Sequence, residues 1–329
     1  MLPSTLLTGA VLGILGAVAV RGMVWVRILD VPDARKAHAT PTPTAGGIGV
    51  LSVVVLAPVL LPALRSPHLL GLLAIASLLG VISLTDDVRA RPVTIKFLAQ
   101  TSAALAAVLL GLRIGPASWG VIGGIVTVVW IIAITNAVNF IDGADGLAPG
   151  VLLLACVILL AVAPAGGAAA GLALALAAGL AGFLPFNWPR AHIFLGDAGS
   201  QPIGFLLACL GLLLPAGHAA LLPALLSGVL FDVGFTLVQR ALAGARLTVA
   251  HRDHLYQRAA LPPGHIAPLH WGFVLWGALC WYSLGTPLAP AVPTLILGPQ
   301  LAWLAIVQAR AHPPKGMPAF RSFSEIPPA

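Results

Sequence analysis

The sequence predicts an all-α polytopic membrane protein. Of its 329 residues, 59% are hydrophobic and only 8% are charged. Water-soluble domains are about 25% charged, so a globule of this composition would lack the polar surface that water requires. The apolar content also excludes an intrinsically disordered chain. Lipid is therefore expected to cover much of the surface.

Long apolar runs predict about eleven transmembrane helices, because a helix needs roughly 20 apolar residues to cross a bilayer. No basic residues precede the first run, which favours a retained helix over a cleaved signal peptide. Only residues 164–167 separate the sixth and seventh runs, so a count of ten stays open. The expected spans are 5–26, 47–64, 69–85, 95–112, 119–138, 148–163, 168–185, 201–217, 221–239, 266–284 and 290–309.

The Lys and Arg residues predict the orientation. Fourteen of the 17 lie in the loops of one side, Arg65 and Arg113 lie on the other side, and Arg21 falls inside the first span. Because cytoplasmic loops are enriched in Lys and Arg, the N-terminus is expected outside and the C-terminus in the cytoplasm. The formal charge of +7 then reflects topology, and no nucleic-acid partner is implied.

All but one of the nine aspartates gather on the same side as most of the basic residues. Eight lie in or beside the predicted cytoplasmic loops, and none lies in an external loop. This face is therefore predicted to carry the functional site. Asp232 stands alone within the ninth span, where a functional role and a helix-to-helix hydrogen bond are equal alternatives.

One domain, residues 1–310, is expected to hold the whole site, followed by a flexible cytoplasmic tail at 311–329. Five cytoplasmic loops carry its polar residues, and we call them loops one to five. They cover residues 27–47, 85–96, 136–147, 186–200 and 240–265.

Loop one combines Lys36 and His38 with Thr42 and a pair of glycines. Cationic side chains, hydroxyls and flexible backbone N–H groups suit a phosphate-bearing ligand. The alternative, which loop one taken alone favours, is a basic, Pro-rich loop that only fixes orientation.

Loop two opens with the adjacent pair Asp86 and Asp87. Neighbouring carboxylates repel each other, which raises the pKa of one of them unless a cation lies between them. A hard divalent ion with oxygen ligands is the usual partner. A helix cap is the alternative, but one Asp suffices for that, so the pair favours a functional site.

Loop three places Asn136, Asn139, Asp142 and Asp145 at intervals of three residues. One helical turn would bring both carboxylates onto one face, and the glycine after each Asp lets the backbone approach a ligand. A plain turn rich in Asn, Asp and Gly is the alternative. The absence of Lys and Arg from this loop favours a functional site.

Loop four ends in the sequence G-D-A-G-S, which contains Asp197 and precedes an apolar run. A turn of small residues at a helix N-terminus is a ready anion site, and Asp197 could hold the accompanying metal ion. An N-cap is the alternative. Asn187, earlier in the loop, could bond to a nucleotide base.

Loop five contains His251, Arg252 and His254. The two histidines lack further Cys or His residues at metal-ligand spacing, which disfavours a zinc site. A cationic cradle for phosphates fits the loop better, and a solvated basic loop is the alternative.

Four motifs, in order along the chain, resemble those of the polyprenyl-phosphate N-acetylhexosamine-1-phosphate transferases, known as glycosyltransferase family 4. They read D-x-R-K-x-H-x-x-P-T-P-x-x-G-G, L-x-D-D, N-x-x-N-x-I-D-G-x-D-G-L and F-N-x-P-x-x-x-I-F-L-G-D-x-G-S. The resemblance covers most of the chain. It implies a multi-pass enzyme of the bacterial inner membrane, with an active site that faces the cytoplasm.

The resemblance also implies roles for individual residues. Asp197 is similar to the family's magnesium ligand, and Asp86 and Asp87 resemble an aspartate pair of which one is proposed to deprotonate the lipid phosphate. His251 is expected to join them in catalysis. Mg²⁺, or alternatively Mn²⁺, is expected on Asp197, Asp86 and Asp142.

The remaining implied residues face the substrates. Those expected to contact nucleotide or phosphate are Lys36, His38, Thr42, Asn136, Asn139, Asp142, Asp145, Asn187, Arg252 and His254. Loop five departs from the family, because many members carry H-x-H-H where this chain reads H-R-D-H-L-Y-Q-R. That form is more similar to the branch that initiates O-antigen chains, so the sugar is less defined than the reaction.

The implied reaction transfers a sugar 1-phosphate from a UDP-sugar to undecaprenyl phosphate and releases UMP. The expected partners are these two substrates and the bilayer, and a homodimer stays open. One in-line displacement and two steps through an aspartyl-phosphate are both compatible with the residues. The alternatives are a muramoyl-pentapeptide transferase of the peptidoglycan type and, from another class, a polytopic transporter.

Overall fold

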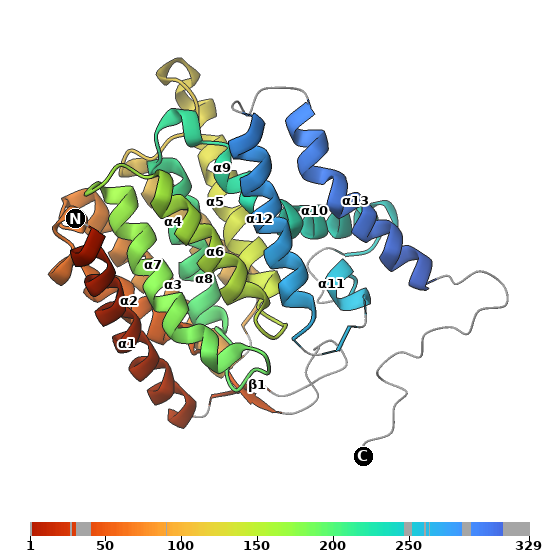
Figure 1. The fold of residues 1–329 in the computed structure, drawn as a ribbon, viewed down its shortest axis with the longest axis horizontal. Coiled ribbons are helices and arrows are strands. Elements are labelled where there is room, and N and C mark those ends of the chain that lie inside the picture. The colour runs from red at the N-terminus through yellow and green to blue at the C-terminus, as the bar shows by residue number, and fades with distance from the viewer. Residues whose placement is uncertain are drawn as a thin grey trace.

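Helices follow one another along most of the chain (Figure 1). The computed structural model describes residues 2–26, 28–30, 41–89, 91–246, 252–259, 261–262, 264–284 and 291–311. The first helices are α1 (Leu2–Val26), α2 (Gly47–Leu60), α3 (Pro67–Val88), α4 (Val93–Leu109), α5 (Gly120–Ile141) and α6 (Leu147–Val162). They are followed by α7 (Ala168–Asn187), α8 (Asp197–Leu213), α9 (Leu221–Leu225), α10 (Ser227–Leu242), α11 (Leu255–Arg258), α12 (Ile266–Leu284) and α13 (Ala291–Ala311).

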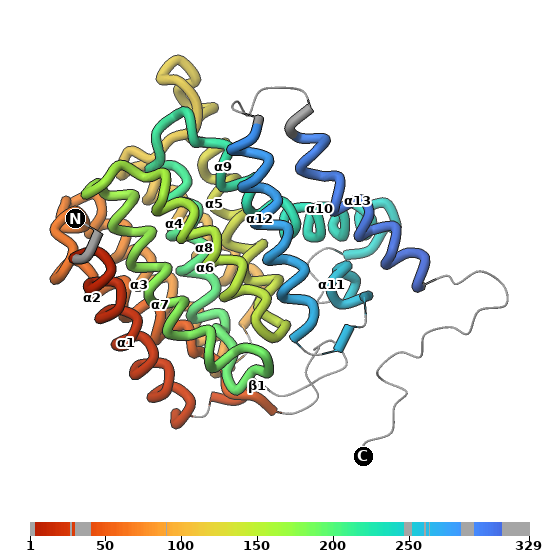
Figure 2. Tube along the Cα trace, viewed as in Figure 1, coloured from red at the N-terminus to blue at the C-terminus, as the bar shows by residue number. Residues whose placement is uncertain are grey.

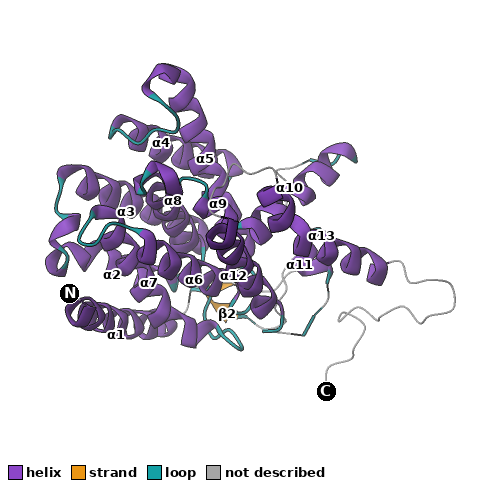
Figure 3. Ribbon diagram, turned by 45° about the horizontal axis from the view of Figure 1, so that its top comes forward, coloured by secondary structure: helices purple, strands orange, loops and turns teal. Residues whose placement is uncertain are grey.

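Strand structure within the described residues is limited to one short pair (Figure 3). The strands β1 (Leu29–Asp30) and β2 (Thr42–Pro43) run antiparallel, with Leu29 opposite Pro43 and Asp30 opposite Thr42. The pair joins the two ends of loop one beside the ends of the helices.

Each of the eleven expected spans coincides with helical structure, but the ninth is broken. Its two parts, Ala216–Leu225 and Ser227–Leu242, are bent by 65°. Within the described residues, α1, α3, α5 and α7 are each long and apolar enough to cross a membrane, and α2, α4, α6 and α8 are shorter apolar helices. The described chain is thus an all-α membrane protein, whereas the count of spans and their orientation stay predictions.

Helix α8 lies at the centre of the arrangement and is buried along nearly its whole length. It packs against α3 and α5 and also contacts α2, while α1, α2 and α7 pack together. Large apolar side chains remain exposed on α1, α3, α4 and α5, where lipid would cover them. Helix α10 runs across the direction of α12 (Figure 1) and presents its buried face to α12 and α13.

The described residues of loops one and four meet at one end of the bundle, where β1 is labelled (Figure 2). Backbone hydrogen bonds join loops one and four there. The amide of Gly46 donates to the carbonyl of Phe194 (2.9 Å), and the amide of Phe194 donates to that of Pro43 (2.9 Å). Loop four is therefore held by the backbone of a segment about 150 residues earlier in the chain.

Helices α2 and α8 cross at a pair of glycines. A Cβ atom added to Gly47 would lie 2.2 Å from Cα of Gly199, and one added to Gly199 would lie 2.3 Å from Cα of Gly47. Real Cβ atoms do not approach backbone this closely, so each position requires glycine. The crossing sets the distance between loop one and the first turn of α8.

The replacement Gly199→Ala is expected to lower the free energy of unfolding by about 1–3 kcal/mol, because backbone must shift to admit the methyl group. Gly22→Ala is the matched control, since a Cβ there meets nothing within 4 Å. Thermal unfolding in detergent micelles measures both. Equal midpoints for the two variants would contradict the close crossing.

Candidate active site

The first turn of α8 is held in place by a carboxylate from another helix. Asp87, near the end of α3, accepts the amide of Asp197 through Oδ1 and the amide of Ala198 through Oδ2, both at 2.9 Å. The first amides of a helix have no partner within it, so Asp87 caps α8 from outside. This cap explains why α8 begins at Asp197, four residues before the predicted span.

A second carboxylate holds the turn just before α8. Asp142, directly after α5, accepts the amide of Gly196 at 2.8 Å and that of Leu195 at 3.3 Å. Gly196 has a φ of 70°, and a Cβ there would lie 2.8 Å from Oδ2 of Asp87. Only glycine fits this position, so Asp87 and Asp142 together fix the G-D-A-G-S turn.

The carboxylate of Asp197 faces a set of polar side chains. Nδ2 of Asn139 donates a hydrogen bond to Oδ1 of Asp197. The same Nδ2 also donates to Oγ of Ser200, at a distance of 2.8 Å. The ammonium of Lys96 forms an ion pair with Oδ2 of Asp197 and lies 3.4 Å from Oδ2 of Asp86. Two carboxylates from different helices therefore share one cation.

Asp86 differs from its neighbour Asp87 in what it contacts. Asp86 accepts the backbone amide of Arg91 and faces Lys96, whereas Asp87 is directed to the start of α8. The side chain of Asp86 is 22% exposed. The adjacent pair is thus split between a partly open position and a backbone-bound position.

Burial raises the pKa of the Asp142 carboxyl well above its usual range. The neighbouring carboxylates of Asp87 and Asp197 raise it further, while the amides of Gly196 and Leu195 act in the opposite direction. A negative charge at Asp142 is consequently favoured by any cation that reaches this cluster.

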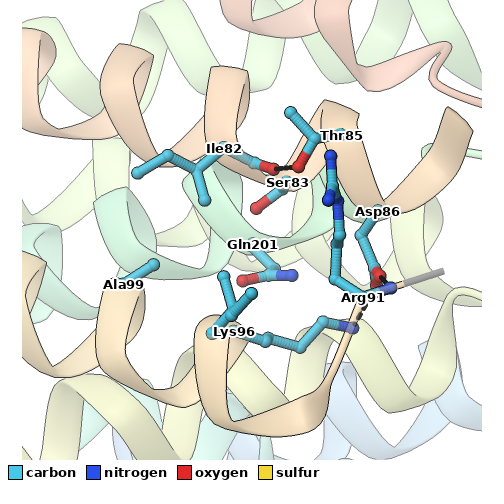
Figure 4. A pocket seen from close by; sticks show the side chains of 9 residues that line it. Ile82, Ser83, Thr85, Asp86, Arg91, Lys96, Ala99 and Gln201 are labelled. Atoms are coloured by element: carbon cyan, nitrogen blue, oxygen red, sulfur yellow. Dashed lines mark hydrogen bonds and ion pairs between the residues drawn. The ribbon is translucent and has the colours of Figure 1, made fainter. Parts of the chain in front are cut away.

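Lys96 is the residue that sequence reasoning missed. It lies in the first turn of α4, and the sequence showed it as a basic residue that follows the aspartate pair and counts toward the positive-inside signal, without a role in the site. Its position ten residues after Asp86, in an otherwise uncharged helix, was the available signal. Figure 4 shows Lys96 and Asp86 directed toward each other at one side of a small cavity.

That cavity lies between α3, α4 and α8 (Figure 4). It is lined by Ile82, Ser83, Thr85, Asp86, Arg91, Ile95, Lys96, Ala99 and Gln201. The Nε2 atom of Gln201 is buried and makes no hydrogen bond, while its Oε1 accepts from Gln100 at 3.2 Å. The cavity therefore extends the polar cluster of Asp86 and Lys96 toward the interior of the bundle.

Two of the predicted substrate contacts have structural partners instead. Asn187 is fully buried; its Oδ1 accepts the amide of Gly146 and its Nδ2 donates to the carbonyl of Ile193, both at 2.8 Å. Asn136 donates to Oε1 of Gln100 at 2.8 Å, joining α4 to α5. These bonds hold loops and helices together, and a contact of either residue with substrate stays a prediction.

The remaining predicted residues lie in β2, in loop three and around α11, or outside the described residues. Thr42 is buried in β2, and Asp145 is half-buried in loop three. Arg252 is exposed before α11, and His254 is buried against Asp232. Lys36, His38 and His251 lie outside the described residues.

The donor chemistry of the cluster fits a hard divalent cation. Asp86 and Asp197 already share a cation position, and carboxylate oxygens are ligands that Mg²⁺ prefers. Asn139 directs its Nδ2 donor to Asp197 and thereby orients that carboxylate. Within the described residues, no three His, Cys, Asp or Glu side chains are grouped closely enough to ligate one ion in this arrangement. Asp87 and Asp142 are engaged with backbone amides.

The described chain is thus an all-α membrane protein with carboxylates, an amide and an ammonium gathered at one end of its helices. The model of the family "Glycosyl transferase family 4" matches residues 69–214, which contain Asp86, Lys96 and Asp197. The chain belongs to this family, as its relatives also show.

Three relatives indicate the range of the family. A probable undecaprenyl-phosphate N-acetylglucosaminyl 1-phosphate transferase of Bacillus subtilis is 30% identical over 246 residues, covering 70% of this chain and 69% of that protein. A decaprenyl-phosphate N-acetylglucosaminephosphotransferase of Mycolicibacterium smegmatis is 35% identical, and the match covers 56% of this chain and 54% of that protein. A phospho-N-acetylmuramoyl-pentapeptide-transferase of Moorella thermoacetica is 30% identical, and the match covers 78% of this chain and 88% of that protein. The chain thus spans just over half the length of the mycolicibacterial relative.

The different tasks of the two adjacent aspartates predict different losses of stability. Asp87→Asn should lower the free energy of unfolding by about 1–3 kcal/mol. The asparagine side chain has a single oxygen, so one of the two buried N–H groups would lose its acceptor. Asp86→Asn is the matched control and should change it by less than about 1 kcal/mol, since Asp86 is partly exposed. Thermal unfolding in micelles compares them, and equal losses would contradict the assignment.

Proposed function

We propose that this chain transfers a sugar 1-phosphate of the N-acetylhexosamine type from a UDP-sugar to a polyprenyl phosphate, and that UMP is released. The observation that carries the proposal is the Asp86–Lys96–Asp197 arrangement, fixed by Asp87 and Asp142 to the turn before α8. Membership of glycosyl transferase family 4 and the printed activities of the relatives support it.

The chemistry suits the residues, because both substrates are phosphates and repel each other. An oxygen of the lipid phosphate attacks the sugar-bearing phosphorus of the UDP-sugar, and the bond from that phosphorus to the oxygen of UMP breaks. Lys96 supplies positive charge beside the reacting phosphates. Near pH 7 the lipid phosphate is already largely ionised, so the reaction needs little from a general base.

Mg²⁺ is part of the proposal. Asp197 and Asp86 would hold it with Asn139 beside them, and the ion would supply charge stabilisation at the pyrophosphate. Asn139 keeps Asp197 oriented through the bond to Oδ1. Asp142, bound to the amides of Gly196 and Leu195, keeps the turn that carries Asp197 in place.

The membrane arrangement completes the proposal. We infer about eleven spans with the N-terminus outside, so that the clustered loops face the cytoplasm of a bacterial inner membrane, where UDP-sugars are found. Transporters place their polar residues near the middle of the bilayer, often on broken helices. Here the acidic cluster lies at helix ends, at one end of the bundle, which favours an enzyme over a transporter.

The test uses purified protein, undecaprenyl phosphate and a panel of UDP-sugars, with release of UMP as the signal. The panel includes UDP-N-acetylglucosamine, deoxy sugars and the UDP-muramoyl-pentapeptide. Release that requires both lipid and Mg²⁺ is expected, and chelation should abolish it reversibly. Asp197→Asn should retain its fold and lose turnover. If a family member used as positive control is active while no sugar yields UMP here, the proposal fails.

Lys96→Gln is expected to lower kcat at least about 100-fold, the scale reported for loss of one group that stabilises developing charge. Arg113→Gln is the control, since this residue is predicted at the opposite side of the membrane and should leave kcat unchanged. Initial rates at saturating UDP-sugar measure both. A Lys96→Gln enzyme with the kcat of the unaltered protein would remove Lys96 from the mechanism.

A further inference from the structure

Asp232 is an acidic residue that the proposed reaction leaves without a task. It lies on α10 and is only 2% exposed. Its carboxylate accepts a hydrogen bond from Oγ1 of Thr236, one turn further along α10, at 3.2 Å. The other donors to Asp232 come from the segment that forms α11.

Three groups of this segment are hydrogen-bonded to Asp232. Nδ1 of His254 lies 3.1 Å from Oδ1, within hydrogen-bonding distance. The amide of Leu255 lies 2.8 Å from Oδ1, and the amide of Tyr256 lies 3.0 Å from Oδ2. Asp232 therefore binds the start of α11 with both of its oxygens.

Helix α11 depends on this attachment. It has four residues, Leu255–Arg258, and its own preceding residue His254 supplies no side-chain cap. A single helical turn is not stable alone in a chain, and its first amides need partners from elsewhere. Asp232 supplies those partners, while an ion pair of Arg240 with Asp253 ties the segment to α10 at a more exposed point.

Helix α11 in turn contacts the active-site cluster through Tyr256. The hydroxyl of Tyr256 donates to the carbonyl of Phe140 at 3.0 Å. This carbonyl lies in the last turn of α5, where helical carbonyls lack partners in the helix. The same hydroxyl would lie 3.3 Å from a Cβ added to Gly143, so Tyr256 lies beside residues that flank Asp142 on both sides in the chain.

His254 adds a second contact to the same segment. Its ring centroid lies 5.4 Å from that of Phe140, and the two rings are tilted by 38°. Its own side chain is buried and bonded to Asp232. The ring of His254, held by Asp232, therefore packs against Phe140 in the last turn of α5.

We propose that Asp232 is a positioning residue of the active site: it holds α11 so that Tyr256 braces the segment from Asn139 to Gly143. Asn139 orients Asp197, and Asp142 holds the turn before α8. Loss of Asp232 would therefore loosen both contacts by releasing α11, although Asp232 itself is not among the residues expected to contact the substrates. The inference rests on the proposed function only for its kinetic test.

The kinetic test is a double-mutant cycle between Asp232→Asn and Tyr256→Phe. Asp232→Asn should lower kcat by about 10- to 100-fold, the scale of a small misplacement of reacting groups. Tyr256→Phe should lower it by a smaller factor. If both act through one contact, the double variant should be no slower than Asp232→Asn alone, which is the non-additivity expected of coupled residues.

Thr236→Val is the matched control, because it removes a donor to the same carboxylate but leaves α11 untouched. It should keep kcat within about twofold of the unaltered protein. Fully multiplicative effects in the cycle, or an unchanged kcat for Tyr256→Phe, would overturn the proposal. A loss for Thr236→Val as large as that for Asp232→Asn would also overturn it, since α10 itself would then be the cause.

Hydrogen exchange supplies a readout that does not depend on activity. In Asp232→Asn and Tyr256→Phe, amides of 139–146 should exchange faster than in the unaltered protein, while those of 69–83 in α3 should not change. Unchanged protection of 139–146 in Tyr256→Phe would overturn the bracing contact even if no UDP-sugar were turned over. Failure of the proposed function and failure of this inference are thereby distinguishable, and Tyr256→Phe carries the test if Asp232→Asn does not fold.

Discussion

The start of α8 is the point on which the rest of the site depends. Its first amides cannot bond within the helix, and the surrounding bundle offers little water to replace such bonds. Asp87 and Asp142 provide the bonds from α3 and from the end of α5. These two carboxylates therefore join three helices at one turn, and the position of Asp197 follows from them.

This constraint divides the aspartates between two tasks. The carboxylate oxygens of Asp87 and Asp142 accept hydrogen bonds from backbone amides, whereas those of Asp86 and Asp197 face the ammonium of Lys96. A group bound to backbone holds its position when a substrate binds. A group that is paired with a flexible cation can exchange that partner for another cation or for a phosphate bound through one. Carboxylates with fixed positions thus lie beside carboxylates whose cation partner can be exchanged.

The sequence was informative about everything that depends on composition and order. Apolar runs predicted helices at the observed positions, because lipid leaves few alternatives to a helix. The placement of all but one Asp in alternate loops predicted that they meet at one end. Asp86, Asp87, Asn139, Asp142 and Asp197 do meet there, as the bonds between their segments show.

What the sequence could not provide is the division of tasks between neighbours. Asp86 and Asp87 are adjacent in the chain, but the turn of α3 sends one toward Lys96 and the other toward α8. Lys96 was read as a topology signal because a basic residue at a helix end can either mark the cytoplasmic side or pair with carboxylates of the site. The break in the ninth span falls between Leu225 and Ser227, and both α9 and α10 pack against α12.

The contacts around α11 extend the same principle to a more distant part of the chain. A buried carboxylate on α10 caps a short helix, and that helix braces the end of α5 through Tyr256. In each case a carboxylate satisfies backbone amides of another element, which costs less than leaving them buried without a partner. A membrane protein with ten acidic residues uses at least three of them in this way, so the loss of any one is expected to act on geometry before it acts on charge.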